Sequence, residues 1–136
     1  MTESNLDDQT FIEQFEQCVL NPAQFNHTGH VRLAWLYLRQ NDEKIAIEKV
    51  CTGIKAYALS LGVKDKFHLT ITYYTVKLIA AREKANSTVS WQQFNSRNSD
   101  LITDCIGVLL QYFNHHTLFS EQARLNLTEP DIKAIE

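Results

Sequence analysis

Three histidines carry the clearest chemical signal in this sequence. His27 and His30 are three residues apart, so their imidazoles share one face if the segment is helical. His68 stands near the start of a second long apolar segment. Imidazole nitrogens bind divalent metals and also serve as general acids and bases. If the three side chains meet, they indicate one of these two kinds of chemistry.

Two predicted helices begin at these histidines. The side chain of Asn26 can accept a hydrogen bond from the first turn of a helix expected over residues 27–40. Asp65 is expected to cap a helix over residues 66–85 in the same way, with His68 as its third residue. Each helix then carries its histidines near its N-terminus. The helix dipole disfavours the imidazolium form there, so the rings are expected to be neutral near pH 7.

The helix over residues 27–40 is expected to be the buried centre of the domain. Between residues 31 and 38 the only strongly polar side chain is Arg32, so this helix is apolar nearly all round. Arg32 and Arg39 are expected to mark its one solvated edge, where Arg32 would pair with a neighbouring carboxylate.

Helix signals continue along the chain and predict an all-α protein. Further helices are expected at residues 8–20, 43–61, 91–96 and 100–113. The joints are short, which favours a single-domain, up-and-down antiparallel bundle of five to six helices. The domain is expected to cover residues 1–136, with frayed ends at 1–7 and 132–136. In that topology the helices over 27–40 and 66–85 start at the same end, so the three histidines converge.

Three interpretations of this histidine set stay open. Three neutral imidazoles beside an open position describe a catalytic zinc, iron or copper site. The histidines could instead be structural, since a histidine at a helix start is often only a solvated cap. The third interpretation is a metal-free polar pocket. Along the helix over 66–85, His68, Thr72 and Thr75 form one polar line that could bind a ligand or orient the His68 ring. Thr72 therefore joins the histidines as a candidate catalytic residue.

Composition argues against several classes of protein. The 136 residues are 44% hydrophobic and 21% charged, which is typical of a folded globule. The net charge of -3 and the lack of a basic stripe argue against a nucleic-acid partner. No apolar run reaches the length of a membrane span, and the acidic start has no secretory apolar region. We therefore expect a cytoplasmic protein without a membrane partner.

Reactive-site motifs are also missing from the sequence. It has no P-loop, no dinucleotide fingerprint and no paired-carboxylate motif, and no Ser-His-Asp or Cys-His arrangement is visible. Cys18, Cys51 and Cys105 are widely spaced in apolar contexts, which predicts three buried thiols in a reducing compartment. His115 and His116 are expected in a turn, and the sequence gives them no role.

Three segments resemble the shared pattern of a family of small, uncharacterised bacterial helical proteins. Its first motif, F-x-H-x-x-H-[VL]-R-x-A-W-x-Y-L, corresponds to residues 25–38. Its second, K-[YF]-H-x-T-x-T, corresponds to residues 66–72, and its third is Leu-Phe-Ser-Glu-Gln-Ala-Arg at 118–124, followed by Pro130-Asp131. The resemblance covers about residues 25–131. It implies membership of this family and no particular reaction.

The resemblance implies that His27, His30 and His68 act as one set, with Thr70 and Thr72 beside them. One position departs from the pattern. The family often has Glu after the third histidine, where this chain has Leu69. If that Glu is a ligand or a general base, this protein lacks it.

Two functions of different classes follow from these observations. The first is a His-lined polar pocket at one end of the bundle, in which His27, His30 and His68 hold a divalent metal or serve as acid–base groups for a small organic substrate. The alternative is a non-catalytic interaction or dimerisation module whose histidines are structural and whose apolar surface binds a partner, including a second copy of the chain. Neither the reaction nor the substrate can be named from the sequence.

Overall fold

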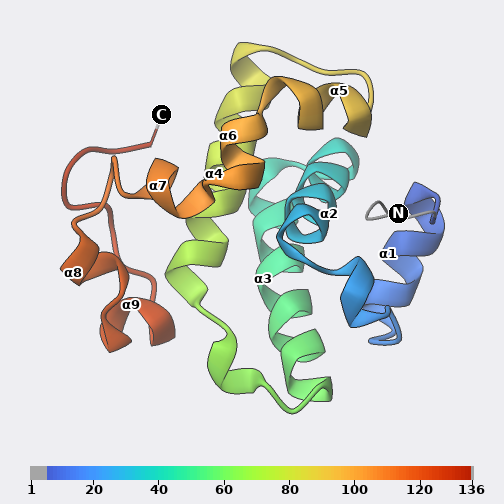
Figure 1. Ribbon diagram of the computed structural model, residues 1–136, viewed down its shortest axis with the longest axis horizontal. Helices are drawn as coiled ribbons and strands as arrows, with labels where there is room; N and C mark the ends of the chain where they lie inside the picture. The colour runs from blue at the N-terminus through green and yellow to red at the C-terminus, as the bar shows by residue number, and fades with distance from the viewer. Residues whose placement is uncertain (1–5, 136) are drawn as a thin grey trace.

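Three long helices form the centre of the computed structural model, which describes residues 6–135 (Figure 1). The described residues are helical and contain no strand, so the predicted all-α class is confirmed. They form nine α-helices and two short 3-10 helices, where five to six helices were expected. The elements are α1 (Asp8–Glu16), η1 (Pro22–Gln24), α2 (His27–Gln40), α3 (Glu43–Ser60), η2 (Lys64–Lys66), α4 (Leu69–Ala85), α5 (Trp91–Arg97), α6 (Ser99–Thr103), α7 (Cys105–Leu109), α8 (His115–Leu118) and α9 (Glu121–Leu125).

Helix α2 is the buried element that was predicted. It packs against both α3 and α4, and every residue from 31 to 37 is buried. Asn26 caps it as expected, because its Oδ1 accepts a hydrogen bond from the Gly29 N–H at 3.0 Å. Helices α3 and α4 run in opposite directions beside it (Figure 1). The starts of α2 and α4 therefore face the same region of the molecule.

The prediction that Arg32 lies on a solvated edge is wrong. Its side chain is buried, and Nη2 donates to Asp8 Oδ1 at 2.8 Å and to the Leu6 carbonyl oxygen at 2.9 Å. The sequence pattern within one helix could not show this, because the partners come from the segment at the start of α1. Only the ion pair with a carboxylate agrees with the prediction. Arg39, by contrast, is exposed.

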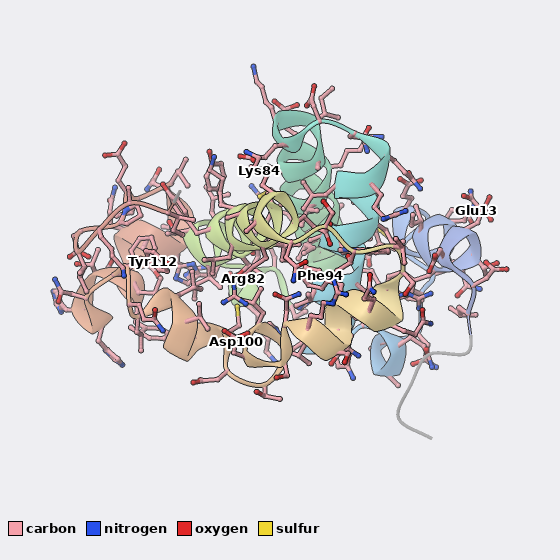
Figure 2. All side chains as sticks on the ribbon, turned by 90° about the horizontal axis from the view of Figure 1, so that it is seen from above. Glu13, Arg82, Lys84, Phe94, Asp100 and Tyr112 are labelled. Atoms are coloured by element: carbon pink, nitrogen blue, oxygen red, sulfur yellow. The ribbon has the colours of Figure 1, made fainter. Side chains whose placement is uncertain are left out.

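The short helices pack around the three long ones. In Figure 1, α1 lies on one side, α5 and α6 cross one end, and α8 and α9 lie on the other side. Figure 2 shows Arg82 of α4 and Asp100 of α6 pointing toward each other. Their ion pair is bidentate, with nitrogen–oxygen distances of 2.9 and 2.7 Å. This pair fastens α6 to the central helix α4.

Two predicted helices are shorter in the structure. The helix expected over 100–113 breaks at Asp104, whose side chain accepts from the Gly107 N–H and so starts α7. The helix expected over 8–20 ends at Glu16, because Cys18 adopts a left-handed backbone with a φ of 58°. In both cases the local backbone ends the helix, although apolar side chains continue along the sequence beyond that point.

Both ends of the described chain are held in place. Asp7 caps α1, and the Ile132 N–H donates to the Tyr112 carbonyl oxygen at 2.8 Å. Asp131 accepts hydrogen bonds from Asn114 and Thr117, which hold its pKa at about 2. Of the ends expected to fray, residues 1–5 and 136 lie outside the described residues. Among residues 6–135, no helix has the length and apolar content needed to cross a membrane.

Candidate functional site

The predicted histidines line one cavity of about 270 Å³ between α2, α3 and α4. Its polar lining residues are His27, His30, Lys66, His68, Thr72 and Thr75. Its apolar lining residues are Ala34, Val50, Ile54, Phe67, Ile71 and Val76. The antiparallel run of α3 and α4 explains the convergence, because it returns the chain to the end where α2 begins. All four residues predicted as a candidate site therefore face one space.

His68 has a structural task at the start of α4. The sequence placed it third in a helix capped by Asp65, and that position is wrong: η2 occupies 64–66, and His68 is itself the N-cap. Its Nδ1 accepts a hydrogen bond from the Ile71 N–H at 3.1 Å. Its Nε2 lies 2.8 Å from the Leu118 carbonyl oxygen. Because Nδ1 accepts, the ring hydrogen sits on Nε2 and is donated to Leu118.

Both ring nitrogens of His68 are thus engaged with the backbone. Protonation of the ring would place a hydrogen on Nδ1 and remove the cap of α4. Burial lowers the pKa of His68, which keeps the ring in the neutral form that the cap requires. The imidazole acts here as Asn or Ser does at other helix starts.

The threonine hydroxyls of the cavity are also engaged. Thr72 Oγ1 donates to the His68 carbonyl oxygen, and Thr75 Oγ1 donates to the Ile71 carbonyl oxygen, each at 2.7 Å. These are bonds within α4 of the kind expected for helical threonines. With their hydrogens committed, the two hydroxyls can only accept from a ligand.

His27 retains one nitrogen for other partners. The residue is exposed, and its Nε2 lies 2.9 Å from the Leu101 carbonyl oxygen, to which it must donate. This contact joins the start of α2 to α6. Nδ1 has no hydrogen-bond partner within residues 6–135, so it remains an unused acceptor of a residue that lines the cavity.

His30 is the imidazole with the most freedom to react. It is half-buried, and its ring packs edge-on against Phe25 with 4.2 Å between centroids. Neither ring nitrogen has a hydrogen-bond partner among the residues that the structure describes. Burial, assisted by repulsion from His27, lowers the pKa of His30 to about 4. At neutral pH the ring is therefore uncharged and offers one donor and one acceptor to the cavity.

The electrostatic balance of the cavity is positive. Lys66 is exposed and lines the cavity, and no ion pair of its side chain occurs within the described chain. No Asp or Glu is among the lining residues. An anionic group is therefore favoured over a cationic one at the Lys66 side of this space.

The residues that the structure describes give no support for a metal at these histidines. Among residues 6–135 no three His, Cys, Asp or Glu side chains form a group that could hold a metal ion. Metal binding through all three predicted histidines would also require His68 to give up the Ile71 or the Leu118 contact. The zinc, iron or copper site predicted from the sequence is not tested by this geometry and stays a prediction.

Other residues singled out by the sequence lie elsewhere. Thr70 Oγ1 donates to the Asn126 carbonyl oxygen and accepts from the Thr128 N–H, so it holds the C-terminal segment against α4. Leu69 lines a separate surface hollow together with Arg124. An acidic side chain at position 69 would therefore meet Arg124 rather than the histidines. His115 and His116 are exposed on α8 and do not line the cavity.

Lys66 and Phe67 are among the cavity residues that were not anticipated as site residues. Lys66 ends η2, and Phe67 follows it in an extended conformation just before α4, and both line the cavity. The sequence placed both inside a regular helix, which hid their position. The available signal was the alternation of polar and apolar side chains from Lys66 to Thr72, which departs from a helical pattern.

No protein-family model matches the chain, and neither a curated protein nor a solved structure matches it. The family resemblance described above therefore stays a prediction, and function has to be argued from the cavity itself.

Proposed function

We propose that the cavity between α2, α3 and α4 binds a small, largely apolar organic molecule through one polar group held by His30. The observation that supports this is a neutral, half-buried imidazole whose two nitrogens lack partners among the described residues, set in an apolar wall. Neither ring nitrogen is among the buried atoms without a partner in residues 6–135, so both are accessible to a molecule that enters the cavity, and the neutral ring offers that molecule one donor and one acceptor.

The dimensions limit the size of the molecule. At about 270 Å³ the cavity is near the lower end of ligand pockets, which span roughly 300–1,000 Å³. The aliphatic and aromatic side chains of the wall suit a short alkyl chain or a single ring. Lys66 adds a positive charge, so a carboxylate is the favoured polar group.

Binding is better supported than proton transfer. A general base works best when its pKa lies near the operating pH, and the pKa of His30 is about 4. His68 and Thr72, which the sequence predicts as catalytic, hold α4 together through their own hydrogen bonds. We therefore assign His30 to ligand recognition, and His68 and Thr72 to positioning the wall.

The proposal is tested with three molecules that share one apolar body. Octanoate, 1-octanol and octylamine are titrated into the full chain while the histidine ring signals are followed by NMR. We expect saturable shifts of the His30 signals, with octanoate binding best and octylamine worst. The ring signals of His115 and His116 should not move, since both are exposed on α8.

A matched pair of variants isolates the imidazole. His30→Phe keeps a ring in the cavity but removes both nitrogens, and we expect octanoate affinity to fall about tenfold. His116→Phe makes the same change on the surface and should leave affinity unchanged. Equal affinity of wild type and His30→Phe, or no saturable shift with any of the three molecules, contradicts the proposal.

The interaction-module alternative makes a different prediction. Large apolar side chains are exposed on several elements, for example Val19, Leu59, Val89 and Phe119. Isolated exposed apolar residues are normal on a monomer, so they favour this alternative only weakly. A stable dimer in sedimentation experiments, combined with no binding of the three probes, would favour it over ligand binding.

A further inference from the structure

A second cavity lies against the other side of the first turns of α2. It has a volume of about 340 Å³, and its polar lining includes Gln24, Asn26, Thr28, Arg32, Gln92 and Asn95. With about 3.6 residues per turn, Thr28 and Arg32 point away from the helix face that carries His27, His30 and Ala34. The two cavities share no lining residue.

The guanidinium of Arg32 is buried and only partly satisfied. The residue is 8% exposed, and its guanidinium carbon lies 4.5 Å from the centre of the Phe11 ring. Nη2 contacts Asp8 and Leu6, as described above. Nε is buried and has no hydrogen-bond partner within the described chain. An Arg side chain has five N–H donors, so part of this one's capacity is unused.

A second unpartnered atom belongs to another residue that lines the same cavity. Gln24 Oε1 is buried and likewise has no partner among residues 6–135. These are the only two buried side-chain nitrogen or oxygen atoms without a partner in that range, and both residues line this one space. Because such atoms are rare in folded proteins, their coincidence needs an explanation.

We infer that this second cavity binds a small carboxylate that carries a hydroxyl or ammonium group on the neighbouring carbon. The carboxylate oxygens would accept from Arg32, whose planar guanidinium matches that group. The adjacent O–H or N–H would donate to Gln24 Oε1. The start of α2 adds a favourable dipole for an anion. This inference is independent of ligand binding at His30.

The test compares two molecules that differ in one hydroxyl. Lactate carries the donor that Gln24 requires, whereas propionate lacks it. Each is titrated into the full chain while the Arg Nε–H signals are followed by NMR. We expect the Arg32 signal to shift on binding and lactate to bind about fivefold more tightly than propionate. The signal of Arg124, whose Nε is paired with Glu121, serves as the internal control.

Two variants separate the two contacts. Gln24→Leu should abolish the preference for lactate while propionate still binds, and Gln40→Leu makes the same change at an exposed site outside the cavity as a control. Arg32→Lys keeps the charge but removes Nε, so both molecules should bind at least about tenfold more weakly. If Arg32→Lys does not fold, the Gln24→Leu result still decides the inference.

Water is the competing occupant. Water molecules that enter the cavity are the alternative partners for these two atoms. In that case neither lactate nor propionate would shift the Arg32 signal, and this outcome overturns the inference. Equal affinity for the two molecules in the wild type would also overturn it, because Gln24 would then have no part in recognition.

Discussion

The two cavities beside α2 use polar residues in opposite ways. In the histidine-lined cavity, His68, Thr72 and Thr75 form hydrogen bonds that build α4 and fasten it to its neighbours, which leaves His30 as the unengaged imidazole. In the second cavity, one donor of Arg32 and one acceptor of Gln24 are left over. The comparison shows that the number of polar residues around a space does not measure its capacity for a ligand. What matters is how many of their hydrogen-bonding atoms remain unused.

Lowering the pH is expected to have the largest effect that distinguishes the histidine-lined cavity from the second cavity. The pKa of His30 is about 4 in the folded protein and 6.5 in an ordinary setting. Between these values the unfolded chain binds more protons, so the free energy of unfolding falls as the pH is lowered from 6.5 toward 4. The loss attributable to His30 is at most about 3 kcal/mol. Urea unfolding of wild type and His30→Phe across this range measures it.

The variant provides the control for that experiment. His30→Phe should show a flatter pH dependence than the wild type, whereas His116→Phe should follow the wild type. Parallel pH profiles of wild type and His30→Phe would show that His30 is not held neutral by the cavity.

Removing the His68 ring should have the next largest effect. His68→Ala loses the cap of α4 and the contact with Leu118, and each is worth about 1 kcal/mol, so unfolding should become easier by about 2 kcal/mol. His68→Asn can restore the cap but not the second contact, and it should recover about half of the loss. Chemical denaturation of the three proteins measures this. A His68→Ala protein as stable as the wild type would show that the polar residues here are not committed to the fold.

Adding a metal ion is expected to change the thermal stability of the protein least. Because both nitrogens of His68 are engaged, we expect equimolar zinc to leave the thermal unfolding midpoint nearly unchanged. Elemental analysis of protein reloaded with zinc, iron or copper gives the complementary measurement. One equivalent retained by the wild type and lost by both His27→Ala and His68→Ala, with all three folded by circular dichroism, would restore the three-histidine metal site.

Local signals explain what the sequence could predict. The all-α class, the Asn26 cap and the long helices expected over 27–40 and 43–61 follow from short-range patterns, and the structure has these helices at 27–40 and 43–60. Convergence of the three histidines also followed, because it needed only the direction of successive helices. The caps and helices depend on residues close together in the chain, whereas the convergence depends on the direction of successive helices.

Distant backbone partners explain what could not be predicted. The rings of His27 and His68 donate to the carbonyl oxygens of Leu101 and Leu118, and a carbonyl has no sequence signature. The partners of buried Arg32 are Asp8, at the start of α1, and the carbonyl oxygen of Leu6, which lies in the segment expected to be frayed. The site residues could therefore be recognised as a group from the sequence. Only the structure shows which imidazoles form hydrogen bonds that hold the fold and which have nitrogens without partners.

Helix α2 is a wall common to both cavities, and this arrangement has a thermodynamic consequence. His30 and Arg32 are two residues apart on one helix but face different spaces. A ligand that moves the start of α2 when it binds in one cavity also changes the shape of the other cavity. Linkage then requires that the factor by which octanoate changes lactate affinity equals the factor by which lactate changes octanoate affinity. The shared helix would thus couple the binding of two chemically different ligands in one small protein.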